Sequence, residues 1–209
     1  MIDLDPQMKH IKPEWLAVVR AALSAFAEIP DEEWEEAASG LRHLHLGKGD
    51  YFIRAGALPD KMACIVSGIF RVSYATPSGE EKILAIRSEG RMLSAFSAFL
   101  EHTPSWYDIQ ALEDSDLLYV SLGQYTEGLK GHVCWQVINA KYAQMLFMEK
   151  ERRESEFLSD SAETRYKKFR ERFPGIEDRI RQYHVASYLG ITPVALSRIR
   201  KKLREKEPS

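Results

Sequence analysis

Glycines recur at nearly constant intervals through the middle of this chain of 209 residues. Gly56, Gly68, Gly79 and Gly90 are separated by 12, 11 and 11 residues, which leaves room for one short strand and one turn in each interval. Short runs with the alternating or β-branched pattern of strands fill residues 41–121, at 44–46, 51–53, 63–66, 69–74, 82–86, 107–112 and 117–120. Such strands between regularly spaced turns predict a β-sandwich or small barrel.

Helical patterns flank the predicted strands on both sides. Residues 13–26 and 31–41 carry apolar side chains at i, i+3 and i+4, and Pro30 separates them. Residues 124–158 lack proline and carry one apolar stripe, which needs a covering surface, either the β domain or the same helix of a second chain. A polar break at 159–163 follows, and Thr-Pro-Ser-Gly-Glu at 76–80 predicts a hairpin turn.

Charge is distributed unevenly along the chain. The total is close to neutral, with 29 Lys+Arg against 31 Asp+Glu. Residues 1–164 nevertheless hold 16 Lys+Arg and 26 Asp+Glu, a net charge of −10, whereas residues 165–209 hold 13 and 5, a net charge of +8. This asymmetry predicts a polyanion-binding module in the C-terminal part.

Composition excludes several classes of protein. Cys64 and Cys134 are the only cysteines, too few for a disulfide framework or for a four-cysteine zinc or iron–sulfur site, and each is interpreted as a small buried hydrophobe. No run approaches the roughly 18 apolar residues of a membrane span. The N-terminal residues lack the basic and apolar regions of a secretory signal, so we expect a cytoplasmic protein with no membrane partner.

The last thirty residues predict a helix-turn-helix. Gly190 suits the left-handed position that ends one helix, Thr192 suits the N-cap of the next, and Pro193 its first position. Small Ala186 would let the two helices cross closely. The second helix has apolar residues three and four positions apart, at Leu196, Ile199 and Leu203.

The exposed face of this second helix has the chemistry of a major-groove reader. Val194, Ser197 and Arg198 lie in its N-terminal half, where Arg198 is able to bind guanine O6 and N7. The helix also carries cations and a hydroxyl placed to meet phosphates. The residues predicted to bind double-stranded DNA are Thr192, Pro193, Val194, Ser197, Arg198, Arg200, Lys201 and Lys202. The alternative is a helical hairpin with a solvated basic face.

Together, these features resemble the Crp/Fnr family of bacterial transcription regulators. The glycine spacing resembles the family's cyclic-nucleotide-binding jelly roll, residues 124–158 its dimerisation helix, and residues 183–203 its helix-turn-helix. The resemblance implies an α+β fold, with a sensor domain at 1–123, the dimerisation helix at 124–158 and an all-α DNA-binding domain at 159–209. It also implies a homodimer on a two-fold symmetric operator, a small-molecule effector and RNA polymerase as a further partner, with no cofactor and no enzyme activity.

The predicted effector site departs from the family pattern. Cyclic-nucleotide-binding members place a Glu for the ribose and, about ten residues later, an Arg for the phosphate, where this chain has Ala95 and Ser105. Losing an ion-paired anion contact costs about 2–5 kcal/mol. We therefore expect an effector other than cyclic AMP, or none. The candidate pocket residues are Arg91, Ser94, Ala95, Phe96, Ser105 and Trp106; the alternative is that the aromatics simply fill the core.

Two other functions remain open on the sequence. One is a small-molecule-binding jelly-roll module whose C-terminal helices bind a protein. The other is a metal-dependent jelly-roll enzyme that uses His43 and His45, which alternate on a predicted strand and so face the same side. Such an enzyme also needs a nearby carboxylate and a further histidine, and the sequence offers neither at the expected spacing.

Overall fold

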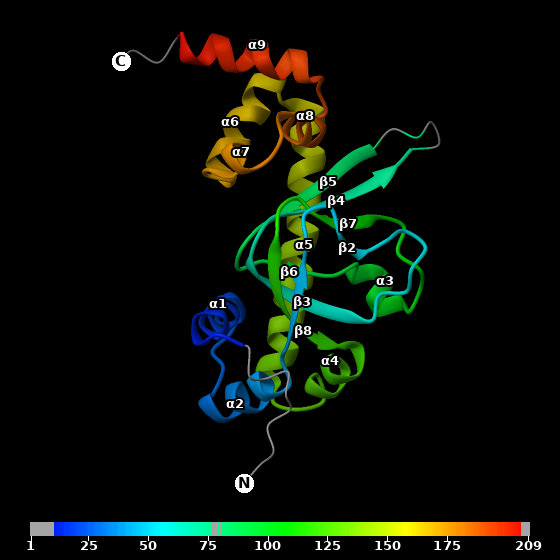
Figure 1. Cartoon of the computed structure of the whole chain (residues 1–209). Coiled ribbons are helices and arrows are strands. Elements are labelled where there is room, and N and C mark those ends of the chain that lie inside the picture. The colour runs from blue at the N-terminus through cyan, green and yellow to red at the C-terminus, as the bar shows by residue number, and fades with distance from the viewer. Residues whose placement is uncertain (1–10, 77–78, 80, 206–209) are drawn as a thin grey trace. The chain divides into compact units, whose positions relative to one another are not determined.

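The computed structural model describes residues 11–76, 79 and 81–205, which fall into two compact units (Figure 1). Unit 1 is Met1–Val72 with Ile86–Leu146, and unit 2 is Ser73–Ala85 with Phe147–Ser209. The predicted hairpin turn at 76–80 lies partly outside the described residues. Within it, Gly79 N–H donates to the Thr76 carbonyl at 2.8 Å.

Two four-stranded sheets form the β-sandwich. One has the order β1 (Arg42–Leu46), β8 (Ser115–Ser121), β3 (Lys61–Ser67), β6 (Met92–Leu93). The other has the order β2 (Tyr51–Ile53), β7 (Asp108–Ala111), β4 (Phe70–Ala75), β5 (Glu81–Arg87). Every predicted strand is confirmed, and β6 is additional. Their inward side chains share one core, made chiefly of Ile53, Ala63, Ile65, Phe70, Leu93, Ile109, Ala111 and Leu117.

The turn that joins β3 to β4 requires a glycine at position 68. Its φ of +113° favours glycine, and a Cβ there would lie 2.0 Å from Ser115 Oγ on β8. Its N–H donates to Glu89 Oε1 at 2.9 Å. The regular glycine spacing therefore reflects, at this position, a backbone that passes too close to β8 for any side chain.

Unit 1 has a second apolar cluster on the outer face of the β1-β8-β3-β6 sheet. Side chains alternate along β3, so Ala63 and Ile65 face the sandwich core while Cys64 faces outward. Helices α1 (Pro13–Ser24) and α2 (Asp31–Ser39), both predicted, cover this face. Cys134 and Ile138 complete the cluster, so both cysteines are buried as predicted.

The segment 124–158, predicted as one helix, forms parts of two. Helix α4 (Leu122–Gly128) begins at a capping box, in which the Ser121 hydroxyl accepts from Gln124 N–H. A turn follows, with Gly131 N–H donating to the Gly128 carbonyl at 3.1 Å, before α5 (Val133–Ser159) begins. The helix α3 (Phe96–Glu101) had no sequence signal, because its six residues are too short for periodicity.

Unit 2 contains the second half of α5, the end of the β4–β5 hairpin and four further helices. These are α6 (Ala162–Arg172), α7 (Ile176–Arg179), α8 (Gln182–Leu189) and α9 (Pro193–Arg204). Its core is aromatic, since the ring centroids of Phe169, Phe173 and Tyr188 lie 5.2–5.7 Å from one another. Among the described helices, none has the length and hydropathy to cross a membrane.

Candidate nucleic-acid interface and sensor sites

The turn between α8 and α9 requires glycine. Gly190 has φ +68° and ψ +34°, and Ile191 N–H donates to the Ala186 carbonyl at 3.0 Å, which ends α8 in a left-handed cap. A Cβ on Gly190 would lie 2.6 Å from Cε1 of Phe157 on α5. The glycine is therefore demanded both by its own dihedral angles and by the neighbouring ring.

The start of α9 has the predicted chemistry. The Thr192 hydroxyl accepts from Ala195 N–H at 3.2 Å, and Pro193 occupies the first turn, where its missing N–H costs nothing. Ala186 and Leu196 are fully buried where α8 and α9 meet, and Leu203 is nearly so. The two helices are thus joined by a tight turn and held by the predicted apolar positions.

Most of the predicted DNA-binding residues, from the N-cap Thr192 along α9, lie away from its buried Leu196 and Leu203. Seven of the eight are exposed: Thr192, Pro193, Val194, Ser197, Arg198, Lys201 and Lys202. Arg200 is partly buried. Lys202 Nζ donates to Glu163 Oε2 on α6 at 2.6 Å, and Lys201 pairs weakly with Glu205 at 3.9 Å. Arg198 forms no ion pair with any residue in the described ranges.

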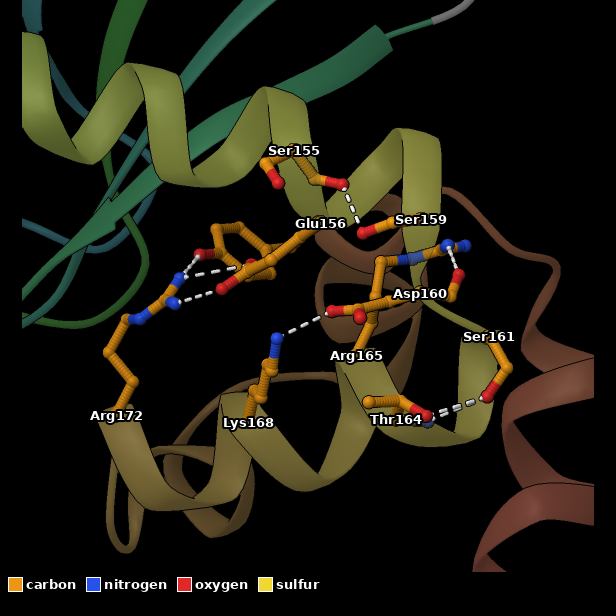
Figure 2. Close-up of polar contacts among 10 residues, drawn as sticks. Ser155, Glu156, Ser159, Asp160, Ser161, Thr164, Arg165, Lys168 and Arg172 are labelled. Atoms are coloured by element: carbon orange, nitrogen blue, oxygen red, sulfur yellow. Dashed lines mark hydrogen bonds and ion pairs between the residues drawn. The ribbon is translucent and has the colours of Figure 1, made fainter.

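Two basic side chains of α6, Arg172 and Lys168, bind carboxylates of the neighbouring segment 156–160 (Figure 2). Arg172 binds the Glu156 carboxylate and donates to Tyr188 Oη at 3.0 Å, while Lys168 Nζ donates to Asp160 Oδ2 at 2.7 Å. Burial disfavours the charged form of Arg172, but the bonds to Glu156 and Tyr188 outweigh it and raise its pKa. Some of the cations that make up the net charge of +8 are therefore paired with carboxylates within unit 2.

Arg153 of α5 joins three elements of unit 2, and nothing in the sequence marked it. Its Nη2 donates to the carbonyls of Ile83 on β5 (2.9 Å) and Tyr188 on α8 (2.7 Å). Its guanidinium lies 4.0 Å from the centroid of the Tyr188 ring. Ser187 Oγ accepts from Ile83 N–H at 3.2 Å, which adds a second link between hairpin and α8. Burial lowers the pKa of Arg153.

The six predicted effector residues have different surroundings in unit 1. Ala95 and Ser105 are buried, and Ser105 Oγ donates to the Tyr107 carbonyl at 2.7 Å. The Phe96 ring packs 5.1 Å from the Tyr142 ring, whereas Trp106 is 61% exposed. The other two members are Arg91, which contacts the sulfur of Met145, and Ser94, which donates to the Lys61 carbonyl.

Unit 1 does contain a cavity, of about 640 Å³, on the outer face of the β1-β8-β3-β6 sheet. It lies between that sheet and the helices α1, α2, α4 and α5, and its walls include none of the six predicted residues. Its apolar lining includes Phe26, Trp34, Met62, Cys64, Trp135 and Tyr142. No local sequence pattern predicts this cavity, because its walls come from segments more than a hundred residues apart.

The two strand histidines face one side, as predicted, and bind a carboxylate that the sequence did not reveal. His43 Nε2 lies 2.8 Å, and His45 Nδ1 3.0 Å, from the same oxygen of Asp116 on β8. Burial raises the pKa of Asp116, but the hydrogen bonds from both rings outweigh it and lower the pKa overall. Among the described residues, no group of three or more His, Cys, Asp or Glu side chains is arranged so that it could hold a metal ion.

The cysteines have the buried surroundings of structural thiols. Burial raises the pKa of the Cys64 thiol to about 12 and also raises that of Cys134. Reactive cysteines need the opposite shift, because the thiolate is the nucleophile. Neither thiol is therefore set up for catalysis or redox sensing.

Comparison with known proteins identifies the fold. Residues 43–132 match the family model described as "Cyclic nucleotide-binding domain". FixK2 from Bradyrhizobium japonicum has a TM-score of 0.67 at 17% identity, covering 79% of this chain and 85% of that one. A CooA mutant from Carboxydothermus hydrogenoformans has 0.66 at 18%, covering 82% and 79%. The Catabolite Activator Protein of Thermus thermophilus has 0.55 at 21%, covering 88% and 87%.

No curated protein matches this sequence. At these identities the structural matches establish the fold alone. The predicted fold class is confirmed: an α+β chain with a jelly roll of the cyclic-nucleotide-binding type, a long helix and C-terminal helices.

Proposed function

We propose that this protein is a sequence-specific, DNA-binding transcription regulator of the Crp/Fnr type that acts as a homodimer and catalyses no reaction. The observation that carries the proposal is the exposed face of α9, where Arg198 stands without an ionic partner among the described residues. The fold shared with FixK2, CooA and the Catabolite Activator Protein over most of the chain supports it.

In this function α8 and α9 are a helix-turn-helix, and α9 enters the major groove. Arg198 binds a guanine edge, and Ser197 and exposed Val194 contact neighbouring bases. Thr192, Arg200 and Lys201 meet phosphates. Lys202 would exchange its bond with Glu163 for a phosphate. Pro193 offers only apolar contact, so the operator is read chiefly through the residues that follow it.

A second copy of the chain would cover an exposed apolar face of α5. Val133 is 60% and Phe147 61% exposed, although both are large apolar side chains. Val137, Ala140 and Gln144 lie between them, at alternating steps of four and three residues. This is the spacing of a coiled-coil seam. Pairing of two such seams would present two α9 helices to a two-fold symmetric operator.

Within unit 2, Arg153 links the β4–β5 hairpin to the end of α8. Strand β5 is part of a sheet of the sandwich. Arg153 donates hydrogen bonds both to the Ile83 carbonyl on β5 and to the Tyr188 carbonyl near the end of α8. A shift of the hairpin would therefore move the Arg153 guanidinium, which also binds the Tyr188 carbonyl of α8. An effector other than cyclic AMP, or no effector, fits the burial of Ala95 and Ser105. RNA polymerase is the expected further partner of such a regulator.

The test is selection of bound duplexes from a random-sequence pool by the full-length protein, followed by affinity measurements over a range of salt. We expect enrichment of a two-fold symmetric site, and a steep fall in affinity with salt from the phosphate contacts. If no sequence is enriched at any salt, the proposal is wrong. Tight binding to a protein partner with little salt dependence would instead support a small-molecule module whose C-terminal helices bind a protein.

A further inference from the structure

The cavity of unit 1 has a lining that is apolar, aromatic and free of basic side chains. Its aromatic members are Phe26, Trp34, Tyr125, Trp135 and Tyr142. A volume of about 640 Å³ is within the range of small-molecule sites and far above the voids left by ordinary packing. The cavity is thus large enough for an organic ligand and is lined mainly by surfaces that bind one.

All the charged side chains in the lining are glutamates, namely Glu33, Glu36 and Glu127. Glu127 is exposed and pairs with Lys130 at 2.7 Å. Glu33 is partly buried, accepts one hydrogen bond from Trp135 Nε1 at 2.9 Å, and forms no ion pair with any described residue. The nearby Arg20 is already engaged by Asp31. A partly buried carboxylate of this kind is stabilised by a cation that enters beside it.

The same walls repel anions. A cyclic nucleotide, a phosphate or a fatty acid would place its negative charge near Glu33 and Glu36 with no basic side chain in the lining to compensate. An organic cation with apolar substituents is attracted both by the carboxylates and by the faces of the indole rings. The Trp34 ring already takes part in such a contact, since the Arg20 guanidinium lies 5.6 Å from its centroid.

We propose that this cavity binds a lipophilic organic cation, with Glu33 as the charge partner and Trp34 and Trp135 as the aromatic walls. None of the six predicted effector residues lines this site, although its wall includes Met92 from the same segment of the chain. Binding is measured on the protein alone, so its outcome does not depend on whether the chain binds DNA.

The experiment compares two probes of nearly equal size and shape but opposite charge, tetraphenylphosphonium and tetraphenylborate. Binding to the full-length protein is followed by tryptophan fluorescence, since two tryptophans line the cavity, and by calorimetry. We expect tetraphenylphosphonium to bind at least tenfold more tightly. Equal affinities, tighter binding of the anion, or no binding of the cation would overturn the proposal.

Three variants locate the site. Glu33→Gln keeps an acceptor for Trp135 and removes the charge, so the preference for the cation should fall at least fivefold. Glu35→Gln is the matched control, because Glu35 lies on the same helix, is exposed and does not line the cavity. Ala37→Phe fills the cavity and should abolish binding of the cation in a protein that still melts cooperatively. Unchanged affinity in Glu33→Gln or in folded Ala37→Phe would place the probe elsewhere and refute the assignment.

Discussion

Helices α6 and α9 are both basic, but an arginine of each has a different environment. On α6, Arg172 binds the buried Glu156, and Lys168, which is partly exposed, binds Asp160 (Figure 2). On α9, Arg198 and Lys201 are exposed, and Arg198 has no ionic partner among the described residues. The difference separates cations that hold the unit together from cations available to a polyanion. Net charge along the sequence counts both kinds alike.

The largest effect should be the loss of stability on removing Arg172, the α6 cation that binds Glu156. Arg172→Ala leaves Glu156, which is 7% exposed, without its partner, and loss of one member of such a pair costs about 3 kcal/mol. Thermal unfolding should show a midpoint lower by roughly 6–12 °C. Arg204→Ala on α9, an exposed position, is the control and should melt like the parent. An unchanged midpoint in Arg172→Ala would mean that the α6 cations are not structural.

The next largest effect should be on DNA specificity, when the exposed Arg198 is removed. Arg198→Ala should remove about 1–3 kcal/mol of discrimination at one base pair, because a bidentate contact to guanine is lost, and should leave the melting midpoint unchanged. Competition binding between the selected operator and its single-base variants measures this. A uniform loss over all sequences would assign Arg198 to a phosphate instead.

Lys201→Ala should weaken DNA binding to all sequences alike and flatten the slope of log affinity against log salt by about 1, as expected for one phosphate contact. Lys168→Ala is the matched lysine on α6. Since its ammonium binds Asp160, it should leave the salt slope unchanged. If the slope of log affinity against log salt were equal for the two variants, the α9 lysine would contact DNA no more than the α6 lysine does, which contradicts the prediction.

The smallest effect concerns Glu163, where the two helices meet. The hydrogen bond from Lys202 lowers its pKa, with a smaller opposing effect of desolvation. A carboxyl group whose pKa is lowered on folding stabilises the protein above its unfolded pKa, and that contribution disappears as pH falls through the folded pKa. Glu163→Gln should therefore lack a small acid-dependent part of the stability, measured by urea unfolding below about pH 4.5. It should also free Lys202 and slightly tighten DNA binding; weaker binding would contradict this.

Local patterns were enough to predict the strands, the first two helices and the turn at Gly190. Each depends on residues within a few positions: the alternation of β3, the apolar spacing before Pro30, the N-cap at Thr192. The prediction of one helix at 124–158 was incomplete, because the capping box at Ser121 and the turn near Gly131 divide the segment. The absence of proline alone did not reveal that break.

The functional details that the sequence missed all depend on distant partners. Glu156 and Arg172 are 16 residues apart, His43 and Asp116 are 73 apart, and Ile83 and Ser187 are 104 apart. No periodicity connects such positions, so composition could not show that Arg172 is structural or that Asp116 lies between two histidines. The predicted effector residues were placed by resemblance, and three of them, Ala95, Phe96 and Ser105, are buried in the fold.

By itself, the sequence determined the secondary structure and which face of each element is apolar, because backbone dihedral preferences and side-chain periodicity act over one or two turns. Tertiary structure decided which charges are available and where space is left. It paired Arg172 with Glu156, left Arg198 on the surface, and formed the cavity beside Glu33. Those outcomes depend on the approach of chain segments that only the folded packing brings together.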